Sequence, residues 1–164
     1  MTVVMASAAA TTPFSTLSMA LTAAVDALAL VPREPDSYRS LGDDALLDLT
    51  RLAADEVRLA QLHVSLLAGE IARRSEPELG SAGLAQRTGH RTPDELVRVT
   101  TGTRVADARA AVRVGTALSA RVQAVDGSTD EQRVSVLGAA VLAGRVSVAV
   151  ADAITTGLGP ASPT

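Results

Sequence analysis

The sequence predicts an all-α fold, a multi-helix bundle with one long central helix at about 43–75 and shorter helices packed around it. Alanine, which has the highest helix propensity, is the commonest residue, and apolar residues recur every three or four positions over long stretches. Glycine, proline and capping residues separate these stretches at intervals typical of helices. A length of 164 residues is that of one domain, and we expect a single helical domain at 15–159.

The first part of the chain predicts a flexible tail, one helix and a linker. Residues 1–14 are uncharged and contain Pro13, and we expect them to form the N-terminal tail. A helix is predicted at 15–31, because apolar side chains recur there on one face. These side chains are Leu17, Leu21, Val25 and Leu28. The segment 32–42, with two prolines and a glycine, predicts a linker that leaves the docking of the first helix open.

The long helix at about 43–75 carries the clearest pattern in the sequence. One apolar row consists of Leu46, Leu49, Ala53, Val57, Ala60, Val64, Leu67 and Ile71. A second row consists of Leu52, Leu59 and Leu66. Together the rows are wider than the seam of a two-stranded coiled coil and predict packing against several helices.

Opposite these rows, charges of opposite sign follow one another at spacings of three and four residues. They are Asp44, Asp48, Arg51, Asp55 and Arg58. Such neighbours form ion pairs on a helix surface, so we interpret this face as solvated.

Shorter helices are predicted after the break at 76–80. A short helix at 81–88 ends at Gly89, and the next begins with Thr92 as N-cap, Pro93 at the first position and Glu95 three residues after the cap. That helix is predicted to end near Gly102.

The following helix is predicted to begin with Thr103 as its cap and to reach about Val122. Its predicted inward residues are Val105, Ala108, Val112 and Leu118.

The last part of the chain predicts two more helices. The segment Asp-Gly-Ser at 126–128 is typical of a turn, and a helix is predicted at 131–143 with Gly144 at its C-terminal end. Ser147 is the predicted cap of a final helix that reaches about Thr156, where a Gly-Leu-Gly-Pro segment stops it. Residues 160–164 are the C-terminal tail.

The residue inventory argues against catalysis. Cysteine, lysine and asparagine are absent, and the only histidines are His63 and His90. Two histidines 27 positions apart do not supply the three or four ligands of a zinc site, and neither lies in an arrangement typical of a nucleophilic triad. We therefore predict no catalytic residues, no metal ligands, no cofactor and no small-molecule substrate.

The N-terminal 25 residues are uncharged, but they do not resemble a signal peptide or a membrane span. No basic residue precedes Arg33, whereas a secretory signal begins with a basic region. Pro13 and several serines and threonines interrupt the apolar stretch, and Asp26 ends it. We expect no membrane association and a cytoplasmic location.

Several segments occur together in an order that is similar to one protein family. They are Leu-Gly-Asp-Asp-Ala-Leu-Leu at 41–47, Glu-Ile-Ala-Arg-Arg at 70–74, Gly-Leu-Ala-Gln-Arg-Thr-Gly at 83–89, Arg-Thr-Pro-Asp-Glu-Leu-Val at 91–97, Thr-Gly-Thr-Arg-Val-Ala-Asp-Ala-Arg at 101–109, Val-Arg-Val-Gly at 112–115, Leu-Ala-Gly-Arg-Val-Ser-Val at 142–148 and Ala-Asp-Ala-Ile at 151–154. In this order they resemble the domain-of-unknown-function family 222, also called the 13E12 repeat family, which is common in actinobacteria. The resemblance covers roughly residues 41–159.

The resemblance implies a helical region that usually precedes an HNH nuclease module, a metal-dependent ββα unit that hydrolyses phosphodiesters. This chain departs from that pattern, because it ends at Thr164 and none of its residues matches the nuclease motif. An HNH site needs a histidine as general base together with metal ligands. We therefore expect a non-catalytic accessory domain of an HNH-endonuclease-type protein.

The basic region at 81–125 suggests contact with DNA. It holds seven arginines and three acidic residues, whereas the chain as a whole has a net charge of −3. Two helices joined by a Thr-Gly-Thr turn resemble a helix-turn-helix, in which Arg104, Arg109 and Arg113 would face phosphates or bases. The turn has threonines where apolar residues are usual, so an ordinary helical corner with solvated arginines is the alternative.

Two other interpretations remain open. The apolar face of the helix at 43–75 suggests a module that binds another protein or a second copy of itself. The other interpretation is a truncated gene product without retained function.

Overall fold

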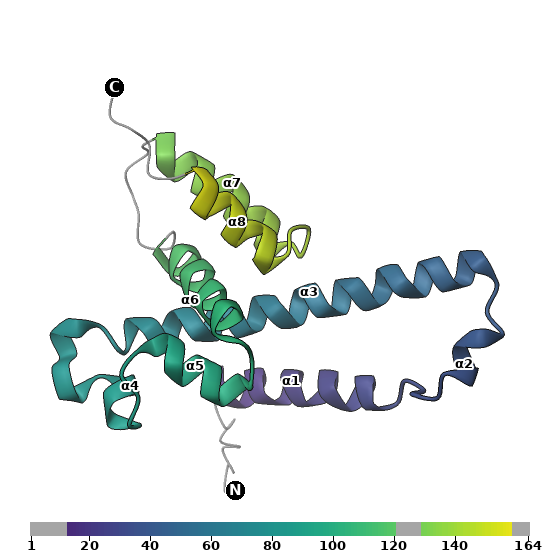
Figure 1. Cartoon of the computed structure of the whole chain (residues 1–164), viewed down its shortest axis with the longest axis horizontal. Coiled ribbons are helices and arrows are strands. Elements are labelled where there is room, and N and C mark those ends of the chain that lie inside the picture. Colours follow the sequence, from purple (N-terminus) through teal and green to yellow (C-terminus); the bar gives the residue numbers. More distant parts are fainter. Residues whose placement is uncertain (1–12, 121–128, 159–164) are drawn as a thin grey trace, which may run out of the picture. The chain divides into compact units, whose positions relative to one another are not determined.

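The computed structural model describes residues 13–120 and 129–158 and confirms the all-α fold (Figure 1). These residues form eight α-helices and one 3-10 helix, and no strand occurs among them. The predicted C-terminal tail, the turn at 126–128, the helix end at Val122 and all but two residues of the N-terminal tail lie outside the described residues. The chain divides into two compact units, residues 1–48 and 49–164, and each is described by itself.

The first unit contains two helices and the start of a third. Helix α1 spans Pro13–Ala29, two residues earlier at each end than predicted. The predicted linker is not free of secondary structure, because its residues include the short helix α2, Asp36–Arg39. Within α2 the Asp36 carboxylate pairs with the Arg39 guanidinium three positions later, and the Tyr38 hydroxyl donates to the Pro32 carbonyl. These local bonds order a segment whose prolines alone predicted an irregular chain.

Helix α3 spans Asp43–Arg73 and ends two residues earlier than predicted. The chain turns after α3 because of two hydrogen bonds of Ser75. Its hydroxyl donates to the Ile71 carbonyl (2.7 Å) and accepts the backbone N–H of Ala85 (3.0 Å). Ser75 is buried, so its side chain ties the end of α3 to the segment that returns toward it.

The segment between α3 and α5 contains less α-helix than predicted. The predicted break at 76–80 falls in a 3-10 helix, Pro77–Ala82, and the predicted helix at 81–88 is reduced to α4, Leu84–Arg87. Gly80 lies inside the 3-10 segment with a φ of 50°, a backbone conformation that interrupts regular helix and favours glycine.

Helix α5 spans Pro93–Thr101 and has the predicted caps. The Thr92 hydroxyl accepts the N–H of Glu95 (3.2 Å), and the Glu95 carboxylate reaches back to accept the N–H of Arg91, the residue before the N-cap (2.9 Å). Gly102 ends the helix in the left-handed conformation with a φ of 68°.

Helix α6 spans Val105–Ala120 and corrects two predictions. Thr103 does not cap it, because the first helical bond is accepted by Arg104 and the Thr103 hydroxyl instead shares a hydrogen bond with the Thr101 hydroxyl (2.8 Å). Val105, predicted to face inward, is exposed at the first turn, before the helix reaches the core.

Helices α7, Thr129–Leu142, and α8, Val148–Leu158, form the C-terminal pair. Gly144 ends α7 with a φ of 67°, as its position predicted. The Ser147 hydroxyl accepts the N–H of Val150 (3.3 Å), so the predicted cap of α8 is also confirmed. The helix continues through Gly157, two residues beyond its predicted end.

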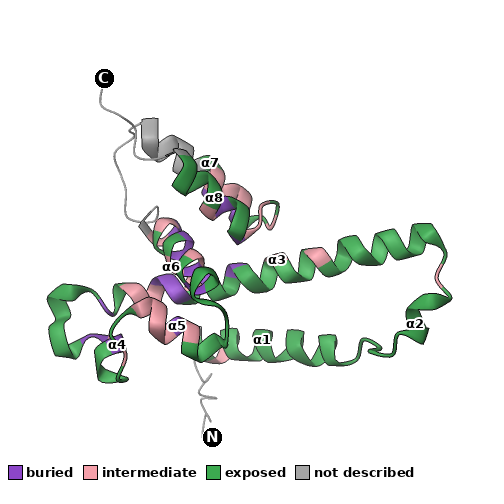
Figure 2. Cartoon of the chain, viewed as in Figure 1, coloured by how far each residue is buried: buried purple, intermediate pink, exposed green. Residues whose placement is uncertain are grey.

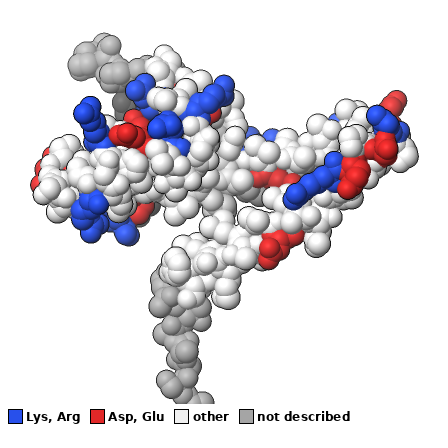
Figure 3. Space-filling model, turned by 60° about the horizontal axis from the view of Figure 1, so that its bottom comes forward, with Lys and Arg blue, Asp and Glu red and all other residues white. Residues whose placement is uncertain are grey.

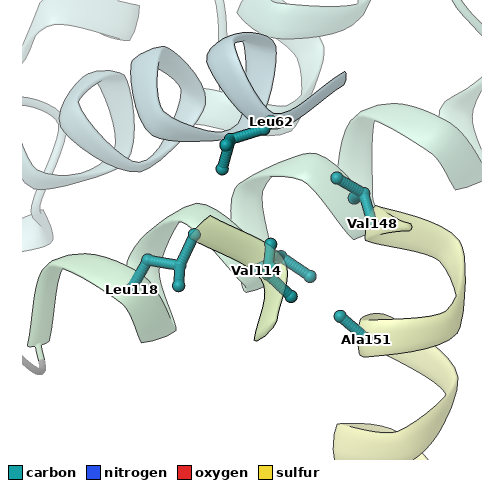
Figure 4. Packing of buried hydrophobic residues seen from close by; sticks show 6 residues of the cluster. Leu62, Val114, Leu118, Val148 and Ala151 are labelled. Carbon is teal, nitrogen blue, oxygen red and sulfur yellow. The ribbon is translucent and has the colours of Figure 1, made fainter. Parts of the chain in front are cut away.

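The second unit packs around two small apolar clusters. The first joins α3, α6, α7 and α8 and consists of Leu62, Val114, Leu118, Val141, Val148 and Ala151 (Figure 4). The second joins α3, α5 and α6 and consists of Ala68, Val97, Ala108 and Ala111. Because both clusters contain a residue of α3 and residues of α6, those two helices organise the unit.

Two glycines allow α3 and α6 to approach each other backbone to backbone. A Cβ built on Gly69 would lie 2.9 Å from the Cα of Gly115 and closer still to its carbonyl group. A Cβ built on Gly115 would lie 2.7 Å from the backbone nitrogen of Gly69 and would overlap the Ser65 carbonyl oxygen. The helices therefore cross at a point where only residues without a side chain fit.

The buried face of α3 differs from the predicted one. Its buried residues are Leu62, Ser65, Ala68 and Gly69, none of which belongs to the two predicted apolar rows. Leu66 and Ile71 are partly buried against the clusters, but most large members of the rows are exposed, and much of α3 is drawn as exposed in Figure 2. Close crossing selects small side chains, so the bulky residues lie away from the packed helices.

Candidate interaction surfaces

The predicted absence of a catalytic centre remains a prediction, but the positions of the two histidines are clear. His63 is exposed on α3, and His90 is half buried after α4. Within residues 13–120 and 129–158, no group of three or more histidine, cysteine, aspartate or glutamate side chains is arranged to hold a metal ion.

The first two arginines of the predicted DNA surface pair with carboxylates of their own unit. The Arg104 guanidinium donates two hydrogen bonds to Asp107, one turn later on α6 (3.0 and 3.3 Å), and this contact raises the pKa of Arg104. The Arg109 guanidinium lies 3.8 Å from the carboxylate of Asp94 at the start of α5. Both arginines are exposed, but each has its charge opposed locally.

The third arginine makes the strongest of these contacts. The Arg113 guanidinium donates two parallel hydrogen bonds to Asp152 of α8, both 2.7 Å long, and this pairing raises the pKa of Arg113. The bidentate geometry fixes both side chains and connects two helices through residues that are 39 positions apart in the sequence. Arg113 therefore holds α8 against α6, a role that the sequence did not suggest.

Acidic side chains accompany the arginines across the surface. Figure 3 shows Asp and Glu groups among the Arg groups on the face in view, rather than an uninterrupted basic area. The three arginines and their carboxylate partners thus sum to a charge close to zero. A phosphate would have to compete with those carboxylates for each guanidinium.

A groove of about 540 Å³ lies between the end of α3, α4, the start of α5 and the second half of α6. It is lined by Gly69, Ala72, Arg73, Ser75, Glu76, Pro77, Gln86, Arg91, Thr92, Pro93, Thr116 and Ser119. The Ser75 hydroxyl is committed to the two hydrogen bonds that close α3, and the Arg73 guanidinium is bound to Glu70. No histidine lines the groove, so it offers no serine–histidine pair for nucleophilic chemistry.

Glu70, one turn before the end of α3, is held by two arginines. Arg73 donates to both of its carboxylate oxygens (2.7 and 2.8 Å), and Arg74 donates to one (2.5 Å). These hydrogen bonds lower the pKa of Glu70 from 4.5 to about 2. Cations in the last turn also suit the negative end of the helix dipole.

The contribution of Glu70 to stability depends on pH. Because its pKa is lower in the folded chain than in the unfolded one, the contribution is complete above about pH 4.5 and disappears as the pH falls toward about 2. Since the side chain is 39% exposed, we expect Glu70→Gln to cost about 0.5–1 kcal/mol at pH 7 and almost nothing near pH 2. Urea unfolding at both pH values measures this difference. Glu78→Gln, on an exposed carboxylate, is the control, and an equal loss at both pH values would contradict the assignment.

The most distinctive surface of the second unit is apolar. We call the residues Leu49, Ala53, Val57, Ala60, Val64 and Leu67 the α3 row. All six are exposed, with Val57 and Leu67 more than half so. The row repeats every three or four residues over 18 positions, the 3.6-residue period of an α-helix, so it runs straight along one side of α3.

On the other side of α3, the predicted charged ladder is only partly a solvated face. Asp55 pairs with Arg58 as predicted, but the Arg58 Nε also donates to the Gly144 carbonyl at the end of α7 (3.0 Å). Arg58 therefore caps another helix, whereas Asp44, Asp48, Arg51 and Asp55 are exposed, as a solvated face predicts.

No family model, no curated protein and no solved structure matches this chain. None of the helices formed by the described residues has the length and apolar character needed to cross a membrane.

Proposed function

We propose that this chain is a non-catalytic helical accessory module that acts by binding another protein surface through the α3 row. The proposal follows the resemblance to the helical region of family 222, which precedes an HNH nuclease in its usual setting. The module then binds a partner protein and carries out no reaction itself.

The exposure of the α3 row is the observation that supports the proposal. Soluble proteins leave single apolar residues exposed, but a continuous row of six along one helix is typical of a surface that another protein covers. The packing of α3 onto its own unit uses a different set of residues, from Leu62 to Gly69. Binding at the row therefore requires no rearrangement of the core.

An environment-sensitive apolar dye tests the surface directly. At low protein concentration we expect the parent chain to enhance the fluorescence of bis-ANS, and we expect Val57→Glu to reduce that enhancement by about half or more. Val99→Glu is the matched control, because Val99 on α5 is 51% exposed and Val57 is 54% exposed. The proposal would be contradicted if the parent chain did not enhance the dye fluorescence, or if both variants reduced the enhancement equally.

DNA contact through Arg104, Arg109 and Arg113 is the competing hypothesis, and the ion pairs weigh against it. We expect the parent and a triple Arg→Gln variant to give the same low anisotropy with labelled duplex DNA at 50–200 mM salt. Glutamine is chosen because a glutamate at position 113 would repel Asp152. Tight binding by the parent alone, falling linearly in log affinity with log salt, would replace protein binding with DNA contact.

A further inference from the structure

We propose that the surface covered by the α3 row is the same row on a second copy of this chain, with the two α3 helices antiparallel. This inference rests on the proposed function, since it assigns a partner to the surface described there. It predicts a two-fold homodimer whose seam is formed by α3 of each copy.

The sizes of the side chains favour pairing of the row with itself. Small and large residues alternate along its centre, in the order Ala53, Val57, Ala60 and Val64. When two such helices lie antiparallel with the two-fold axis between Val57 and Ala60, Val57 of one copy faces Ala60 of the other. In the same register Ala53 faces Val64, so each large side chain meets a small one.

The ends of the row fit the same register. Leu67 of one copy lies beside Leu49 of the other, so leucines close both ends of the seam. The row is about 27 Å long at 1.5 Å per residue. Its straight course allows two helices to remain in contact over several turns with a small crossing angle.

A parallel arrangement fits less well. Every residue would then face its own counterpart, so Ala53 would meet Ala53 and leave a gap, while Val57 would meet Val57. A gap between two alanines weakens the packing, because the alanine methyl groups that line it lose dispersion contacts on that side. The alternation of sizes therefore selects the antiparallel orientation.

The polar side chains beside the row favour the same orientation. Glu56 and His63 lie along one edge of the row and are both exposed. In the antiparallel register Glu56 of one copy lies within one turn of His63 of the other, twice in the dimer. In a parallel pair the two-fold axis would run along the seam, so the Glu56 side chains would lie on opposite sides of it and the contact with His63 of the other copy would be lost.

Sedimentation velocity over a concentration series tests the homodimer. We expect the mass of the parent chain to rise from that of one copy to that of two, while dye fluorescence per chain falls as the row is covered. Val57→Glu should remain monomeric at every concentration, and Val99→Glu should dimerise like the parent. Dimerisation of Val57→Glu equal to that of the parent would overturn the assignment to the α3 row.

Introduced cysteines test the orientation, because the chain contains none of its own. Ala53→Cys and Val64→Cys are prepared separately, mixed and oxidised. We expect a disulfide-linked heterodimer from the mixture and little linkage from either variant alone. Rapid linkage of Ala53→Cys to itself would show a parallel seam and overturn the proposal.

Sedimentation and dye binding together distinguish failure of the homodimer from failure of the proposed function. A parent chain that is monomeric at all concentrations and still binds the dye at the row overturns the homodimer but leaves the row open for a different protein. A monomer that binds no dye has its row covered within one chain, and both the homodimer and the proposed function are then wrong.

Discussion

Gly115→Ala is expected to destabilise the second unit strongly. The added methyl group would overlap the Ser65 carbonyl oxygen and lie 2.7 Å from the backbone nitrogen of Gly69. Backbone atoms cannot rotate away as a side chain can, so α3 and α6 would have to separate. Both apolar clusters depend on these two helices, so we expect a loss of about 3 kcal/mol or more, a large fraction of the stability of a domain this size.

Gly157→Ala supplies the control for this prediction. Gly157 lies within α8, and a Cβ built on it meets no atom within 4 Å. The same chemical change should there stabilise the chain by up to about 1 kcal/mol, because alanine is the better helix former. Thermal unfolding followed by circular dichroism measures both variants. Similar melting temperatures for Gly115→Ala and the parent would show that the close crossing is wrong.

Leu62→Ala is expected to produce the second large effect. Leu62 is 5% exposed and is the α3 member of the cluster that joins α6, α7 and α8. Truncation removes its buried methyl groups and leaves a cavity between four helices, which costs about 2–5 kcal/mol at such sites.

A leucine on the same helix controls for the change of residue. Leu52 is 56% exposed, so Leu52→Ala should alter the free energy of unfolding by less than about 1 kcal/mol. Urea unfolding of both variants, at a concentration where the chain is monomeric, separates burial from helix propensity. Equal losses at the two positions would contradict the assignment of Leu62 to the core.

Capping residues made much of the helix order predictable from the sequence. Thr92, Gly102, Gly144 and Ser147 each occupy the predicted position at a helix end, because capping depends on hydrogen bonds between residues that are close in sequence. Thr103 is the exception, since its hydroxyl bonds to that of Thr101 instead.

The buried face of α3 could not be identified from hydrophobicity. The prediction assumed that the largest apolar side chains face the core, whereas the helix crossing requires small ones at Ser65 and Gly69. The signal that was missed is the four-residue spacing of these two, with Gly115 on the partner helix. Small residues at that spacing are typical of helices that approach closely.

The ion pairs of the arginines also could not all be predicted from the sequence. Asp152 lies 39 positions from Arg113, and only the packing of α8 on α6 brings the two together. Charge counting over 81–125 included the local acids but not this one, so it did not reveal that Arg113 is paired.

An isotope-filtered NOE experiment on mixed labelled and unlabelled chains tests the central claim most directly, because it detects only protons of two different copies. We predict cross-peaks between the Ala53 methyl group of one copy and the Val64 methyl groups of the other. Their absence at concentrations where the chain is dimeric would contradict the account, as would intermolecular contacts confined to other helices.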